Sequence, residues 1–228
     1  NAAFSAALYA VIGWGGELIA VDTGVEDLDY TARFNRDVAT GERIDPNRAF
    51  DESNPIYVAT VLARRANRPI VALHTNAPGF DPDESTCGPP PRVEGSGSVS
   101  IELCNRTYSP RPSPDRRWPF DDSDTLAILP HLATDPPGRG WCAAALERAG
   151  YNISYERVVT SDGSLSNYAV QRGIPYLNFE TRDRGNDAAD IAAARDRLLA
   201  MIDVAMEQCL GPEARLMTPR GGRDRALP

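Results

Sequence analysis

The sequence contains no lysine. All 24 of its basic residues are arginine, and 32 acidic residues give a formal net charge of −8. No cluster of basic residues interrupts this acidic balance, whereas binding to nucleic-acid phosphates needs concentrated Arg or Lys. We attribute the missing lysine to a GC-rich bacterial coding bias, and we expect no nucleic-acid partner.

Long apolar runs are also absent. No segment approaches the roughly 20 consecutive apolar residues of a membrane-spanning helix. The N-terminus has no charged region ahead of an apolar core, as a signal peptide would. We therefore expect a soluble chain with no membrane span. A length of 228 residues, 42% of them hydrophobic, is enough for one domain with a sizeable core.

The four cysteines lack C-x-x-C spacing, which argues against a zinc-thiolate cluster or a thioredoxin-like site. Cys87 and Cys104 bracket a segment rich in Pro, Gly and Ser, where a disulfide could contribute about 3 kcal/mol. Cys142 and Cys209 fall on two expected helices and could pair with each other. Free buried thiols are the alternative. If the disulfides form, the protein is periplasmic or secreted.

Helical and strand periodicities alternate along the chain, which predicts an α/β fold with a mixed, mostly parallel central sheet flanked by helices. Helices are expected over residues 2–12, 54–66, 141–149 and 188–210, and strands over 17–23, 70–73, 98–103, 153–159 and 174–179.

The expected domain organisation is a single catalytic domain over residues 1–210, with a Pro/Gly-rich insertion at 78–119. Residues 211–228 are rich in Arg, Gly and Pro, and we expect a disordered tail there. The chain begins at Asn1 without a Met, so either a leader has been removed or the sequence is a fragment.

One carboxylate follows an apolar strand directly. The run from Ile174 to Phe179 has the composition of a buried strand, and it ends at Glu180. An unpaired buried carboxylate costs several kcal/mol, so Glu180 needs a partner such as Arg182 or Arg184, or a place in a catalytic site.

Two other polar sites stand out. His74 ends the predicted strand 70–73, and the carboxyl ends of strands are where ligands bind in α/β sheets. The other histidine, His131, follows a proline and is expected in a loop. Pro46 restricts the chain before Asn47 and Arg48, an amide and a guanidinium that could together grip a carboxylate; a helix cap and a surface ion pair are the alternative.

Three short motifs carry a resemblance to a known family. They are D-P-N-R at residues 45–48, A-L-H-T-N at 72–76 and N-F-E-T-R-D-R-G at 178–185. In order and in flanking residues they resemble the zinc-dependent metallocarboxypeptidase superfamily, including its shorter bacterial carboxypeptidase and desuccinylase-like branches. The third motif is the most specific, since it resembles the F-E-x-R-D-x-G of that family.

The resemblance implies roles for five residues. Glu180 would be the general base that activates the attacking water, and His74 would be a ligand of one zinc ion. Asn47 and Arg48 would bind a carboxylate of the substrate. Tyr168, in a polar loop upstream of the Glu180 strand, would lie over the substrate.

The H-x-x-E motif that supplies two zinc ligands in that family does not occur in this chain. One interpretation aligns Trp14 to Glu17 with it, which keeps Glu17 as a ligand. The other, which we favour, places the motif upstream of Asn1, just before the first helix. An arginine that polarises the scissile carbonyl would be Arg33 or Arg36.

Two functional hypotheses of different classes follow. The first is a zinc-dependent hydrolase that cleaves an amide or peptide bond in a substrate with a free carboxylate, such as a peptide, a cell-wall stem peptide or an acyl-amino acid. This chain would lack activity if two ligands are missing. The alternative is a non-catalytic protein on the same fold that binds carboxylates or peptides.

Overall fold

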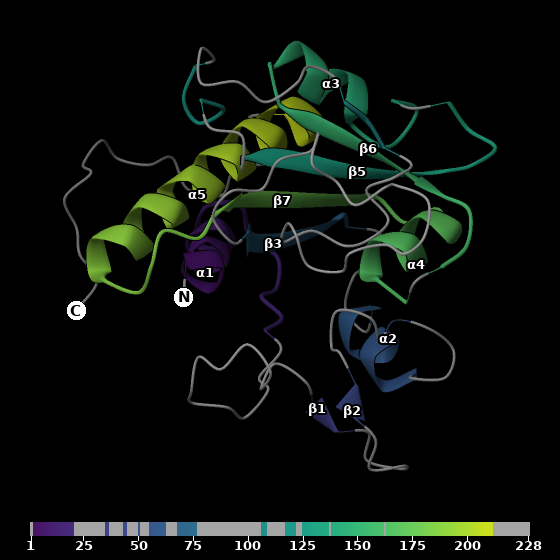
Figure 1. Ribbon diagram of the computed structural model, residues 1–228, viewed down its shortest axis with the longest axis horizontal. Coiled ribbons are helices and arrows are strands. Elements are labelled where there is room, and N and C mark those ends of the chain that lie inside the picture. The colour runs from purple at the N-terminus through teal and green to yellow at the C-terminus, as the bar shows by residue number, and fades with distance from the viewer. Residues whose placement is uncertain are drawn as a thin grey trace, which may run out of the picture.

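A computed structural model describes the fold (Figure 1). It describes residues 2–20, 35–36, 43–44, 50, 55–62, 68–76, 106–108, 117–121, 125–136, 138–161 and 163–211, and structural statements below concern these residues.

Helices and strands alternate through most of the described chain. In order they are α1 (Ala2–Trp14), β1 (Asn35–Arg36), β2 (Arg43–Ile44), α2 (Pro55–Leu62), β3 (Ile70–Asn76), β4 (Arg106–Tyr108), β5 (Leu126–Leu132), α3 (Ala143–Arg148), β6 (Ile153–Val158), α4 (Leu165–Gln171), β7 (Tyr176–Arg182) and α5 (Ala188–Leu210).

The central sheet has five described strands in the order β3-β7-β5-β6-β4. Strand β7 is parallel to β3 and antiparallel to β5, while β6 is parallel to β5 and antiparallel to β4. The predicted mixed sheet with flanking helices is confirmed. Among the described strands, two of the pairings are parallel and two are antiparallel, and the two parallel pairings are the longer ones. Strands β1 and β2 form a separate antiparallel pair.

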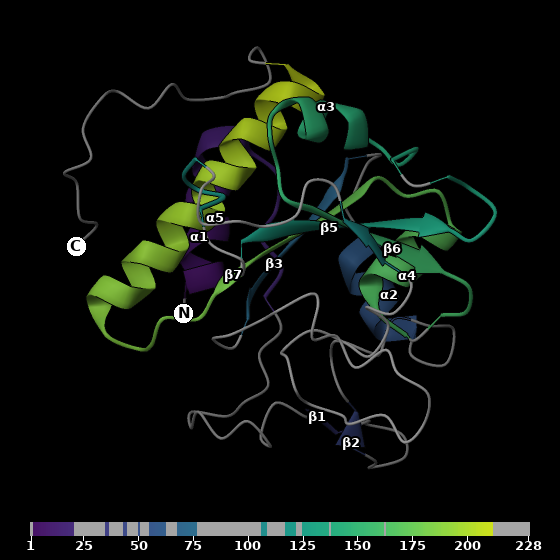
Figure 2. The ribbon, with the colours of Figure 1, turned by 45° about the horizontal axis from the view of Figure 1, so that its top comes forward.

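One face of the central sheet forms the hydrophobic core. Alternate strand residues point to it, including Leu177 and Phe179 of β7, Ala127 of β5, and Ile153 and Tyr155 of β6. Buried side chains of α1, α3 and α5 complete the same cluster. Figures 1 and 2 show α1, α3 and α5 on this side of the sheet, and α4 on the other.

Helix α5 is the longest element of the core. Asp187 caps its N-terminus, since the carboxylate accepts a hydrogen bond from the backbone N–H of Asp190 at 2.9 Å. Gly211 follows the helix with a φ of 90°, which favours glycine. The predicted core positions Leu198, Ile202 and Met206 are confirmed as buried; Ile191, Leu199 and Val204 are only partly buried.

A disulfide joins the two helices expected to share one. Cys142, immediately before α3, is bonded to Cys209 of α5, and their Cα atoms lie 5.4 Å apart. The bond closes a segment with a sequence separation of 67 residues and ties α3 to α5 on the core side of the sheet. Cys87 and Cys104 lie outside the described residues.

The N-terminal segment leaves several of its larger apolar side chains exposed. Helix α1 packs against α5 and β3 through small residues such as Ala6, while Phe4, Leu8 and Ile12 are exposed along its outer face. The core strand expected over residues 17–23 is wrong for residues 17–20, which form no strand and include the exposed Ile19. An apolar pattern in the sequence does not indicate whether a neighbouring strand is available, and none of the described strands pairs with residues 17–20.

Among the described residues, no helix combines the length and the apolar character needed to cross a membrane. The predicted strand at residues 98–103 lies outside the described residues, as do most of the 78–119 insertion and the tail beyond residue 211.

Candidate functional site

His74 and Glu180 lie side by side in the sheet. Each is the fifth residue of a seven-residue strand, and the parallel pairing of β3 with β7 places them in register with each other. Paired residues on neighbouring strands project from the same face and have backbones about 4.8 Å apart. His74 is half-buried and Glu180 is only 5% exposed. Two predicted site residues, 106 positions apart in the sequence, therefore share one face near the carboxyl ends of their strands.

A third polar residue contacts the glutamate directly. Asn178 lies two positions before Glu180, so both side chains leave the same face of β7. The Asn178 amide donates a hydrogen bond from Nδ2 to Glu180 Oε1 at 2.8 Å. Asn178 is 9% exposed, and its Oδ1 has no hydrogen-bond partner in the described part of the chain. Sequence reasoning did not single out Asn178, although period-two alternation within N-F-E places it beside the acid.

The same face carries further buried polar groups on β6. Ser154 pairs with Ile128 of β5, which in turn pairs with Asn178, so the three form a row across three strands. Glu156 lies two residues further along β6, and both Ser154 and Glu156 are buried. This polar face of the sheet, with His74, Asn178, Glu180, Ser154 and Glu156, is opposite the hydrophobic core.

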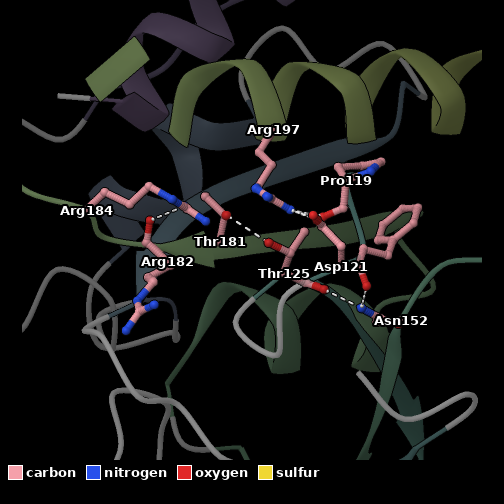
Figure 3. A network of polar contacts seen from close by, with 9 residues as sticks. Pro119, Asp121, Thr125, Asn152, Thr181, Arg182, Arg184 and Arg197 are labelled. Carbon is pink, nitrogen blue, oxygen red and sulfur yellow. Dashed lines mark hydrogen bonds and ion pairs between the residues drawn. The ribbon is translucent and has the colours of Figure 1, made fainter. Parts of the chain in front are cut away.

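Hydrogen bonds on the core side hold the strand at Glu180. The hydroxyls of Thr181 and Thr125 are 3.0 Å apart and point toward each other in Figure 3. Asn152 donates from Nδ2 to the Thr125 carbonyl at 2.9 Å. Since Leu126 pairs with Glu180 across β5 and β7, these contacts fix the backbone immediately next to the site. They do so from the opposite face, without using the polar face.

An ion pair closes the same end of the sheet. Arg197 of α5 donates to both the Pro119 carbonyl and the Asp121 carboxylate (Figure 3). The hydrogen bond from Arg197 holds the pKa of Asp121 below its ordinary value of 3.8. The Asp121 side chain is 37% exposed, so solvent screens the pair and its contribution to stability is small. Its role is to attach the segment before β5 to α5.

Tyr168 lies in a helix, and the predicted loop position is therefore wrong. Ser164 caps α4 by accepting a hydrogen bond from the Asn167 backbone N–H at 3.3 Å, so the helix begins at Leu165, earlier than expected. Tyr168 is buried, with the Arg172 guanidinium 4.3 Å from its ring centroid. Helix α4 packs against β5 and β7. The role of Tyr168 in substrate binding stays a prediction.

The histidine expected in a loop is also placed differently. His131 is the sixth residue of β5 and is buried. Its Nδ1 lies 3.0 Å from the carbonyl oxygens of both Leu132 and Asp135. Carbonyls only accept, so Nδ1 carries the proton and donates to them. Leu126 and Ile128 of β5 lie on the same face of the sheet as Glu180, and side chains alternate between faces along a strand. His131 therefore lies on the opposite face from Glu180, and its role is structural.

The predicted carboxylate-binding pair Asn47 and Arg48 lies outside the described residues, as does Arg33 and the side chain of Arg36. Two residues beyond Arg48, Phe50 is buried and donates its backbone N–H to the Gly163 carbonyl at 2.8 Å, next to the N-terminus of α4.

One interpretation of the sequence aligned Trp14 to Glu17 with the missing H-x-x-E motif, but in the structure Trp14 makes a contact with another helix. Its indole N–H donates to Asp203 of α5 at 2.7 Å, so the tryptophan belongs to the contact between α1 and α5. Glu17 is exposed.

The polar face brings together an imidazole, which can bind a metal ion or transfer a proton, and a carboxylate oriented by an amide. Within the described ranges, no group of three or more His, Cys, Asp or Glu side chains is arranged to hold a metal ion. No family model matches the chain, and no curated protein or solved structure shows significant similarity to it.

Proposed function

We propose that this protein is a zinc-dependent hydrolase on a carboxypeptidase-like fold, which cleaves an amide or peptide bond in a substrate with a free carboxylate. The supporting observation is the pairing of His74 with Glu180 on adjacent parallel strands. Each came from a separate motif, and a ligand with a general base beside it is the arrangement that this chemistry requires.

The donor set fits zinc in part. A catalytic zinc site uses three protein ligands with nitrogen, sulfur or oxygen donors. His74 would supply one of them, and the other two would be residues outside those described. A bound zinc ion would polarise the scissile carbonyl and lower the pKa of the attacking water.

Glu180 carries the proton in this mechanism. Its carboxylate accepts a proton from the attacking water as the oxygen bonds to the carbonyl carbon. It then donates that proton to the amide nitrogen, so that the carbon–nitrogen bond breaks into a carboxylic acid and an amine. In the proposal, Arg48 and Asn47 hold the substrate by its carboxylate and so align the scissile bond with Glu180. Tyr168 would cover the substrate.

Metal analysis is the first test. The folded full-length protein should contain about one zinc ion per chain, and His74→Ala should lower that content. A folded, active protein without metal would contradict the proposal.

The second test uses two buried glutamates of the same polar face. Glu180→Gln should lower turnover of C-terminal peptides or acyl-amino acids by at least about 10²–10⁴-fold, with substrate binding retained. Glu156→Gln on β6 is the matched control, and its turnover should stay close to wild type once the folded fraction is confirmed by circular dichroism. Equal turnover in wild type and Glu180→Gln would remove Glu180 from the mechanism.

The alternative function is a carboxylate- or peptide-binding protein without catalysis. A metal-free protein that binds such ligands, and loses binding in Arg48→Ala but not in Glu180→Gln, would support it. The disulfide between Cys142 and Cys209 supports a periplasmic or secreted location for either function.

A further inference from the structure

We infer that Asn178 is a positioning residue, which helps to hold the Glu180 carboxylate in an orientation from which it can transfer a proton. The inference rests on the proposed function of Glu180, and it adds a residue that the three motifs did not assign. It depends on the hydrogen bond from Asn178 Nδ2 to Glu180 Oε1 at 2.8 Å.

The direction of this bond follows from the chemistry of the two groups. An ionised carboxylate can only accept, so the amide must present Nδ2 to it and turn Oδ1 away. Oδ1 of Asn178 finds no hydrogen-bond partner within the described residues. The hydrogen bond to Glu180 therefore sets the orientation of the amide, and it restrains the carboxylate in return.

Burial of both side chains strengthens the hydrogen bond between Asn178 and Glu180. Both side chains are less than a tenth exposed. A hydrogen bond to a charged group is worth about 1.5–3 kcal/mol, and more of that is retained where water competes poorly. A glutamate has three rotatable side-chain bonds, and the bond to Oε1 restricts all of them. Because the carboxylate is planar, fixing Oε1 also fixes the direction of Oε2.

The backbone is held independently of Asn178. The contact between Thr181 and Thr125 lies on the opposite face, and the pairing with His74 and Leu126 fixes Glu180 within the sheet. Loss of the Asn178 amide should therefore loosen the glutamate side chain while the strand stays in place. Misplacing a reacting group by about 1 Å can cost about 10²-fold in rate.

The experiment compares Asn178→Val with Asn178→Thr. The two replacements have nearly the same shape and both suit a strand, but only threonine keeps a hydrogen-bond donor. The first measurement needs no activity: high-resolution crystal structures should show Glu180 in one conformer in wild type and Asn178→Thr, and in several in Asn178→Val. One unchanged conformer in Asn178→Val would overturn the inference.

The second measurement separates kcat from KM. Asn178→Val should lower kcat by about 10²-fold with KM within about twofold of wild type. Asn178→Thr should recover about tenfold of that loss. Ser154→Ala, a buried polar change on the same face, should leave both constants near wild type. Equal kcat in the valine and threonine variants would also overturn the inference.

A third measurement covers the case in which the variants at 178 do not fold. The Asn178 side-chain amide protons, observed by NMR in otherwise unaltered protein, should exchange slowly with solvent, and Glu180→Ala should make them exchange faster. Unchanged exchange would show that the bond does not form in solution. If the wild type hydrolyses no substrate, the proposed function fails, while the crystal structures and the exchange data still decide whether Asn178 holds Glu180.

Discussion

The two faces of the central sheet are built from the same strands, yet they differ in composition and in purpose. In β7, Leu177 and Phe179 enter the core beneath α5, while Asn178 and Glu180 point the other way. Strand β6 repeats the pattern, with Ile153 and Tyr155 against Ser154 and Glu156. Among these residues the apolar side chains lie on one face and the polar ones on the other, so mutations in neighbouring residues should have separable effects.

Phe179→Ala should give the largest effect on the core face. Phe179 is fully buried and stacks against Tyr151 with ring centroids 5.8 Å apart. Truncating a buried Phe costs about 3–5 kcal/mol, because it removes apolar burial and leaves a cavity. Urea denaturation would measure the loss, with Phe179→Leu as a milder control. A loss as large in Glu180→Gln would break the distinction between the faces.

Removing the disulfide should come next. The double variant Cys142→Ala/Cys209→Ala frees the segment that links α3 to α5, and should lower the free energy of unfolding by about 2–4 kcal/mol. Because both cysteines lie on the core side, the Asn178 to Glu180 bond should persist, as amide exchange of Asn178 would report. Unchanged stability would mean that the helices hold their places without the bond.

Arg197→Gln should have a smaller effect that depends on pH. Since Arg197 holds the pKa of Asp121 below 3.8, the pair stabilises the fold above that pH and its contribution is lost as pH falls through the folded pKa. The variant should lose up to about 1 kcal/mol at neutral pH, and the loss should be smaller in acid, where only the hydrogen bond to the Pro119 carbonyl remains. Arg195→Gln is the control, because Arg195 pairs with its neighbour Asp196. A difference that widens in acid would contradict the assignment.

Ser154→Ala should have the smallest effect. The Ser154 hydroxyl is buried on the polar face and has no hydrogen-bond partner among the described residues. Removing it should leave the free energy of unfolding within about 1 kcal/mol of wild type, on the stabilising side. Thermal unfolding would detect the shift. A clear destabilisation would show that the polar face also contributes to stability.

Much of the fold followed from periodicity. The apolar run at residues 70–73 lies within β3, the amphipathic pattern at 188–210 matches α5, and the expected pairing of Cys142 with Cys209 is present. In each case a local pattern and the tertiary environment favour the same structure. His74 and Glu180 were predicted as strand-end residues for the same reason.

The errors have a common physical origin. His131 was expected in a loop because proline precedes it, but Pro130 lies within β5, past the last described pairing of that strand with β7, so that β5 pairs there with β6 alone and a proline is tolerated. Residues 17–20 have the apolar pattern of a strand, yet none of the described strands pairs with them. Neither outcome could be predicted locally, since strand formation depends on neighbours that are distant in sequence.

The site was predictable in position more than in detail. The strand-end rule located His74 and Glu180, but their pairing depends on the order of strands in the sheet, which the sequence does not show. The period-two alternation of a strand places Asn178 on the same face as Glu180, so Asn178 could have been predicted from the sequence, but it was missed. Tyr168 was displaced from a loop to α4 because the Ser164 cap extends that helix toward its N-terminus.

The alternation of β7 also makes the strand intolerant of small deletions. Loss of one residue between Gly173 and Tyr176 would tend to shift β7 by one position, which would drive Glu180 into the apolar layer and expose Phe179. A shift by two positions would preserve both faces, but would move the glutamate away from His74 by about 6.8 Å. Length variation in homologous chains should therefore be rare in this turn, whatever the identity of its residues.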